Sequence, residues 1–91
     1  MYYKGKTLET IGQIFDEALR LAKEGDLNEC KRFFRGYIEH IADDKGCTLD
    51  EADKIARNNI GYFAGYCDNK TVKLIYDTYD LSHPIFGNYV S

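Results

Sequence analysis

The side chains whose chemistry could support catalysis are few in this chain. Cys67 precedes Asp68, and His83 would join them if the C-terminal stretch folded back, which would pair a thiol nucleophile with an imidazole base. A neighbouring carboxylate raises the pKa of a thiol, however, and so disfavours the reactive thiolate. The other histidine, His40, falls near the end of a predicted helix, where a surface or capping role suits a cation. We therefore expect no enzymatic activity and assign no catalytic residue.

The sequence shows no standard pattern of metal or phosphate ligands. Cys30, Cys47 and Cys67 are odd in number and lack CxxC spacing, so they predict neither a zinc site nor a disulfide framework. A set built from Cys47, Asp68 and His83 matches no usual ligand spacing, and no HExxH motif or phosphate-binding loop is present. We expect no metal and no cofactor, and the unpaired cysteines are typical of a reducing cytoplasm.

The length, composition and charge of the chain limit the classes of protein to which it can belong. The chain has 91 residues with 44% hydrophobic content, which predicts a single domain over residues 1–91. No apolar run approaches the roughly 20 residues of a membrane-spanning helix, and the first residues are polar, so we predict no signal peptide and no membrane contact. The net charge is -3, with 12 basic and 15 acidic side chains mixed along the chain, which disfavours nucleic acid as a partner.

Apolar residues recur at steps of three and four residues along four stretches, which is the period of a helix with one buried face. They predict helices over Thr7 to Glu24, Leu27 to Lys45, Leu49 to Cys67, and Lys70 to Tyr79. No stretch alternates as a strand would. The predicted fold class is therefore all-α, a small bundle of about four helices.

Capping signals separate the predicted helices. Gly25 and Gly46 suit helix ends, and Asp26 and Thr48, each followed three residues later by glutamate, have the form of a capping box. Asp68 and the residue after it give a weaker signal that the third helix ends and the fourth begins. Connections this short favour antiparallel helical hairpins.

The C-terminal stretch is expected to be irregular, because Pro84 prevents the fourth helix from continuing. We predict that it packs back on the third helix beside Gly61 and Gly65, with Phe86 mostly buried. Phe86→Ala would then cost about 3 kcal/mol of stability. His83 is expected to form a structural hydrogen bond with the rest of the domain.

The stretch NNIGYFAGYCDN in the third predicted helix is the candidate docking surface. Gly61 and Gly65 lie four residues apart on one helix face, and large rings stand beside them, from Tyr62, Phe63 and Tyr66. A glycine inside a helix costs roughly 1 kcal/mol relative to alanine, so the two glycines need a compensating contact. Either another helix of the chain crosses closely there, or the face receives a partner or a ligand, with Asn58, Tyr62 and Asp68 as its lining.

Tyrosine is over-represented, with eight tyrosines and five phenylalanines and no tryptophan. Tyrosine is enriched at the energetic centres of protein interfaces, which favours a binding role. We interpret Tyr37, Tyr76 and Tyr79 differently, as residues at the edge of the core with their hydroxyls in water.

The last third of the chain carries a GYxAGY segment at residues 61–66, a threonine at position 71 and an HPIFG segment at residues 83–87. On these motifs it resembles small uncharacterised proteins encoded by phages and prophages. In that family a GYxAGY segment is followed by a threonine-led helix and a closing HPIFG or HPVFG. Cys67 stands where the family pattern has a further tyrosine. The resemblance implies a phage origin and residence in the host bacterial cytoplasm, and it implies no activity. The matching residues are Gly61, Tyr62, Ala64, Gly65, Tyr66, Thr71, His83, Pro84, Ile85, Phe86 and Gly87.

Three functional hypotheses follow. The first is a non-enzymatic interaction protein that binds a host or phage protein, or a second copy of itself as a homodimer. The second is a binder of a small nucleotide-like ligand in a pocket between the third helix and the HPIFG stretch. The third is a nucleic-acid-associated accessory protein that uses Lys31, Arg32 and Arg35. The residues assigned to binding are Asn58, Gly61, Tyr62, Gly65, Tyr66, His83 and Phe86.

Overall fold

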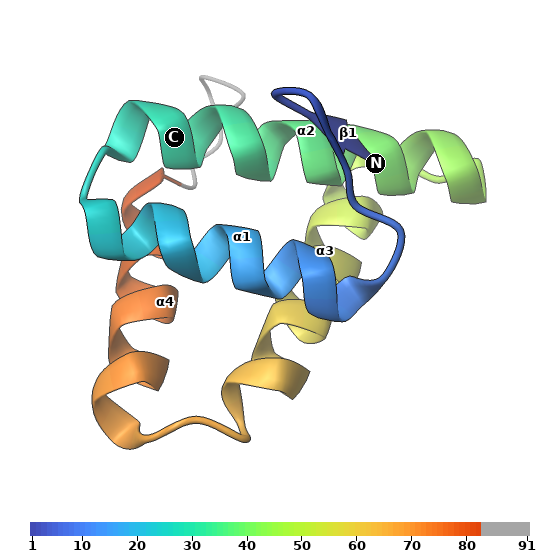
Figure 1. Cartoon of the computed structure of the whole chain (residues 1–91). Coiled ribbons are helices and arrows are strands. Elements are labelled where there is room, and N and C mark those ends of the chain that lie inside the picture. Colours follow the sequence, from blue (N-terminus) through green and yellow to red (C-terminus); the bar gives the residue numbers. More distant parts are fainter. Residues whose placement is uncertain (83–91) are drawn as a thin grey trace.

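Four helices follow a short β-hairpin in the described part of the chain, residues 1–82 of the computed structural model (Figure 1). The elements are β1 (Tyr2–Tyr3), β2 (Lys6–Thr7), α1 (Ile11–Glu24), α2 (Leu27–Lys45), α3 (Leu49–Ala64) and α4 (Asn69–Ser82). The all-α bundle of about four helices is confirmed. The predictions for the C-terminal stretch, including those for His83 and Phe86, lie outside the described residues.

The caps between α1, α2 and α3 fall where the sequence places them. Gly25 and Gly46 have φ of 78° and 64°, the left-handed conformation that glycine adopts without steric cost. The Asp26 carboxylate accepts hydrogen bonds from two backbone N–H groups of the first turn of α2, and the Thr48 hydroxyl accepts one from Glu51 in α3. These caps fix the short connections, so α1 and α2 run antiparallel (Figure 1).

Three predicted helix boundaries were wrong, and one of them is the end of the fourth helix, which extends to Ser82 and not only to Tyr79. The first helix starts at Ile11 and not at Thr7, because Thr10 forms a capping box with Gln13. The third helix ends at Ala64 and not at Cys67, because the next backbone hydrogen bonds, from Tyr66 and Cys67, reach back only three residues and tighten the turn. The Asp68 carboxylate then accepts the N–H of Thr71 at 2.8 Å and caps α4.

The residues before α1 form a hairpin that the sequence analysis did not predict. Tyr2 pairs with Thr7 and Tyr3 with Lys6. Lys4 and Gly5 both have positive φ, 47° and 81°, as a tight two-residue hairpin turn requires. Strands of two residues are too short to show alternation, which is why the pattern was missed.

Contacts with Glu29 hold this hairpin on α2. The Tyr3 hydroxyl donates to the Glu29 carboxylate at 2.6 Å, and Lys4 and Arg32 form ion pairs with the same carboxylate. Hydrogen bonds from Lys4 and then from Tyr3 lower the pKa of Glu29 to about 2. The Tyr3 ring also packs edge-on against Phe33, with ring centroids 4.9 Å apart. The hairpin is therefore a docked part of the domain.

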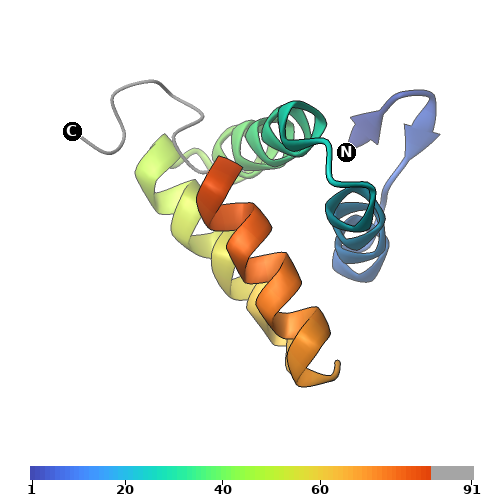
Figure 2. The same ribbon diagram turned by 90° about the vertical axis from the view of Figure 1, so that its left-hand side faces the viewer.

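The two helical hairpins cross each other. α1 and α2 lie together, and α3 and α4 project from them as a second antiparallel pair, seen side by side in Figure 2. All four helices share one core. Its largest fully buried side chains all come from α2, α3 and α4, and they are Cys30, Phe33, Phe34, Ile38, Ile60, Ile75 and Tyr79.

Two tyrosine hydroxyls that were expected to be in water are buried. Tyr37 accepts a hydrogen bond from the Asn59 side-chain amide at 2.9 Å, and burial raises the pKa of Tyr37. Tyr79 donates to the Asp53 carboxylate. The expectation was wrong because α3 supplies a polar partner to each hydroxyl, which offsets the cost of removing it from water.

Candidate functional site

Asn58 and Tyr62 lie four residues apart on an exposed strip of α3, and Tyr66 follows four residues later in the turn just after the helix ends. The Tyr62 and Tyr66 side chains are 64% and 75% exposed. Their rings meet edge to face with centroids 5.6 Å apart, and the Tyr66 hydroxyl donates to the Tyr62 hydroxyl at 3.3 Å, which raises the pKa of Tyr66. The structure thus brings these three predicted residues together at the surface.

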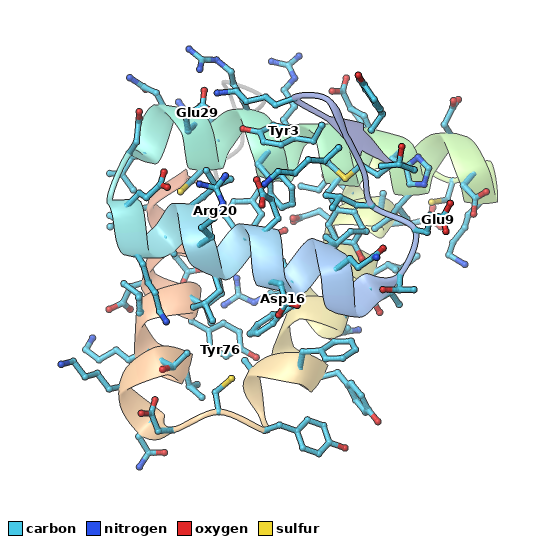
Figure 3. All side chains as sticks on the ribbon, in the orientation of Figure 1. Tyr3, Glu9, Asp16, Arg20, Glu29 and Tyr76 are labelled. Atoms are coloured by element: carbon cyan, nitrogen blue, oxygen red, sulfur yellow. The ribbon has the colours of Figure 1, made fainter. Side chains whose placement is uncertain are left out.

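Gly61 is packed inside the chain. Tyr76 of α4 lies over it, so that a Cβ at Gly61 would collide with the Tyr76 hydroxyl oxygen. Figure 3 shows Tyr76 reaching from α4 toward α3. The Arg57 guanidinium also lies over the Tyr76 ring, 5.4 Å from the ring centroid. Of the two explanations for the glycines, close packing between helices of the chain therefore applies at Gly61.

Gly65 differs from Gly61. It is exposed at the end of α3 with an ordinary helical φ of -62°. A Cβ there would meet only backbone oxygens of its own helix, the nearest at 3.4 Å. The two glycines therefore do not form one continuous docking face.

An apolar hollow of about 500 Å³ opens beside Tyr62, between the start of α1 and the second half of α3. We call it the α1–α3 hollow, and it is lined by Thr10, Ile11, Gly12, Asn59, Tyr62 and Phe63. Ile11 is 41% exposed. Gly12 leaves room at the wall, since a Cβ there would lie 3.6 Å from the Phe63 ring.

Contacts with other side chains of the domain support the wall of this hollow. Phe63 stacks on Phe15 of α1, with ring centroids 5.9 Å apart, and also meets the edge of Tyr62 at 5.4 Å. Asn59 is held by its hydrogen bond to Tyr37. The hollow is therefore built by side chains whose positions are fixed by the core, with Ile11 and Tyr62 exposed at its rim.

Five of the seven residues predicted to bind lie in the described part of the chain, and of these five only Tyr62 lines the α1–α3 hollow. Asn59 and Phe63 fall within the stretch predicted as the docking surface but were not assigned as binding residues, and Thr10, Ile11 and Gly12 of α1 were not assigned to the site at all. Gly12 was one signal that could have indicated the hollow, because a glycine inside a helix often marks a place where another element comes close. The sequence could not show that α3 forms the other wall of the hollow, because this depends on how the helices cross in the folded chain.

A second hollow of about 210 Å³ adjoins the first. It lies between the start of α1, the end of α2 and α3, and it shares Ile11 and Asn59 with the α1–α3 hollow. Its other lining residues are Met1, Leu8, Glu9, Ile14, Tyr37, His40, Ile41, Asp44, Lys45 and Ile55.

The basic group on α2 is partly neutralised. Arg32 forms an ion pair with Glu29, and Arg35 approaches Glu39 at 3.6 Å. The anionic neighbours reduce the attraction of this face for a phosphate backbone.

Within residues 1–82, no group of three or more histidine, cysteine or acidic side chains is placed to hold a metal ion. The Cys67 thiol donates to the Phe63 carbonyl oxygen at 3.7 Å. None of the described helices is long and apolar enough to cross a membrane.

Comparison of the chain with protein-family models, with curated proteins and with solved structures found no match. The class of this protein is therefore given by its fold and its surface alone. It is a small all-α bundle with an apolar hollow between α1 and α3. The resemblance of its last third to phage proteins stays a prediction.

Proposed function

We propose that this chain is a non-enzymatic interaction protein that binds a segment of a protein partner in the α1–α3 hollow. The observation that carries the proposal is the exposure of Ile11 and Tyr62 at the rim of an apolar hollow of about 500 Å³. An exposed apolar surface of this kind, bounded by polar residues, is typical of interaction sites.

The chemistry of the rim supports a protein partner. Tyrosine buries a large ring at low cost in conformational entropy, and its hydroxyl can bond to a partner's backbone. The contact between the Tyr66 and Tyr62 hydroxyls restricts the Tyr62 ring before binding. A ring that is already ordered loses less entropy in the complex, which favours affinity.

The resemblance to phage proteins extends the proposal. On that basis the partner is a host or phage protein in the bacterial cytoplasm, or a second copy of this chain. A small ligand is the alternative, since a volume of about 500 Å³ lies within the range of small-molecule sites. The few polar groups in the hollow, from Thr10 and Asn59, favour the protein partner.

Site-specific photo-crosslinking tests the proposal. Tyr62 is replaced by a photoreactive phenylalanine derivative in the cells that natively make the chain, and the same replacement at Tyr2, which is 73% exposed, is the matched control. We expect a discrete protein adduct from position 62 that is absent from position 2. Mass spectrometry of the adduct distinguishes a second copy of the chain from another protein.

The absence of any protein adduct at position 62 would contradict the proposal. The same set of adducts at both positions would also contradict it, because it would show contact without specificity.

A further inference from the structure

We infer that the N-terminal β-hairpin, residues 1–8, is a strap that releases from α2 as a unit, and that its release uncovers an apolar face of α2. The inference goes beyond the proposed function and does not depend on it, since none of the residues that line the α1–α3 hollow comes from the hairpin.

Apart from the covalent chain, only side chains of the hairpin join it to the helices. Within residues 1–82, its backbone hydrogen bonds stay inside the hairpin, where the Leu8 N–H donates to the Met1 carbonyl oxygen at 2.7 Å. Its hydrogen bonds and ion pairs to the helices end on two carboxylates, Glu29 of α2 and Glu17 of α1. A hairpin whose strands have two residues each is at best marginally stable by itself. Loss of the contacts with the carboxylates therefore releases the whole hairpin.

Glu29 is the main latch. The Tyr3 hydroxyl donates to its carboxylate at 2.6 Å, and Lys4 forms an ion pair with it. The Glu29 side chain is only 14% exposed, so water and salt screen these contacts less than they screen a pair on the open surface. Figure 3 shows the Tyr3 ring reaching along α2 toward Glu29. On α1, Lys6 adds a second contact, to Glu17 at 3.1 Å.

Both carboxylates stay paired after the hairpin leaves. Glu29 keeps its ion pair with Arg32 of the same helix, and Glu17 keeps Arg20, with nitrogen and oxygen 2.6 Å apart. Release therefore leaves neither carboxylate without a cation, and the large cost of an unpaired, mostly covered charge does not arise. This pairing favours opening of the hairpin over unfolding of the helices beneath it.

The hairpin covers apolar groups of α2. The Tyr3 ring packs edge-on against Phe33, which has no exposed surface, with ring centroids 4.9 Å apart. The Met1 methyl group lies over Gly36, 3.5 Å from the place where a Cβ would stand. Figures 1 and 2 show the hairpin on the outside of the helical bundle. This face of α2 therefore has a covered and an open state, and the latch at Glu29 sets the balance between them.

Hydrogen exchange followed by nuclear magnetic resonance tests the inference. The Leu8 amide, which bonds within the hairpin, reports on the hairpin, and the Ile60 amide in the buried part of α3 reports on global unfolding. We expect Glu29→Gln to speed the exchange of Leu8 about tenfold, because the variant loses the ion pair with Lys4 and weakens the hydrogen bond from Tyr3. The exchange of Ile60 should change much less.

A matched variant and a change of salt locate the latch. Glu39→Gln removes a carboxylate of the same helix that approaches Arg35 and not the hairpin, so it should leave the ratio of Leu8 to Ile60 exchange at the wild-type value. High salt should speed Leu8 exchange about two- to threefold in the wild type and less in Glu29→Gln, because Lys4 is 60% exposed and salt screens its ion pair.

A variant of the hairpin tests the covered face. Tyr3→Ser/Lys4→Asn removes both contacts with Glu29, and asparagine tolerates the positive φ of position 4. Tyr2→Thr, at a side chain that is 73% exposed, is the control. We expect the double variant to bind more of the dye anilinonaphthalene sulfonate, which fluoresces on exposed apolar surface, while its Ile60 amide stays protected.

Three outcomes would overturn the inference. Exchange of Leu8 that always changes in step with Ile60 would show that the hairpin opens only with the whole domain. Equal effects of Glu29→Gln and Glu39→Gln would remove the latch, and a double variant that binds no more dye than the wild type would show that no apolar face is uncovered. None of these outcomes bears on binding in the α1–α3 hollow, so the failure of this inference and that of the proposed function are distinguishable.

Discussion

Replacing Phe34 by alanine is expected to lower the free energy of unfolding by about 3–5 kcal/mol. Phe34 is 1% exposed, and its ring packs edge-on against Tyr79 of α4 at a centroid distance of 4.8 Å and against Phe33 at 5.8 Å. The substitution would remove contacts between the two helical hairpins and leave a cavity that the neighbouring helices cannot fully close. Denaturant unfolding measures the loss.

Two further variants make this test decisive. The total stability of a domain of 91 residues is about 5–14 kcal/mol, so Phe34→Ala could leave too little folded protein for an accurate value. Phe34→Leu, which keeps most of the volume, should cost clearly less and remain measurable. Leu27→Ala on the same helix, at a side chain that is 44% exposed, should change stability by no more than about 0.5 kcal/mol. Equal effects at positions 34 and 27 would contradict the packing.

Alanine at Gly61 is expected to destabilise the chain by about 1–3 kcal/mol, because its Cβ would collide with the Tyr76 hydroxyl oxygen. The next atom of that side chain, Cζ, would lie at an ordinary 3.5 Å. In a Tyr76→Phe background the obstacle is absent, and Gly61→Ala should then stabilise α3 by up to about 1 kcal/mol through its higher helix propensity. The same substitution should thus change sign between the two backgrounds.

A double-mutant cycle of Gly61→Ala with Tyr76→Phe measures this coupling. Gly65→Ala is the matched control, since a Cβ there would meet no side chain, and it should be neutral or mildly stabilising in both backgrounds. A cycle with no coupling at position 61 would show that Tyr76 does not lie over Gly61 in solution. The glycine would then be open to a partner, as the competing explanation holds.

The helices could be predicted because their signals are local. The buried stripe of α2 follows from its apolar period, and the glycines and capping side chains at positions 25, 26, 46 and 48 mark where the helices stop and start. Each signal acts within about one turn, so no knowledge of the partner helices is needed.

The predictions for the start of α1 and for the residues of the hairpin before it were wrong for the same reason. Leu8 fits the apolar stripe of a longer helix, and it is buried, but it reaches the core from the segment that closes the hairpin, where its N–H bonds to the Met1 carbonyl oxygen. A dipeptide with positive φ at both residues, Lys4–Gly5, was the available signal. A glycine with so few strand residues around it is weak evidence for a turn, and the helical period outweighed it.

The candidate site was predicted only in part, because it depends on how the hairpins cross. The exposed ring of Tyr62 could be expected from its place on α3. The partner of Gly61 and the exposure of Ile11 could not, since the first is decided by Tyr76 of α4 and the second by the position of α1 against α3. Contacts between segments far apart in the chain leave no mark in a local pattern.

The most direct test of the central claim, binding of a protein segment in the α1–α3 hollow, is a nuclear magnetic resonance titration. The segment captured at position 62 is added to the isotope-labelled chain, and backbone amide shifts are followed. The binding account predicts the largest shifts at Ile11, Gly12, Asn59, Tyr62 and Phe63. Shifts confined to the basic face of α2, at residues 31–35, or to any surface that leaves those five residues unchanged, would contradict it.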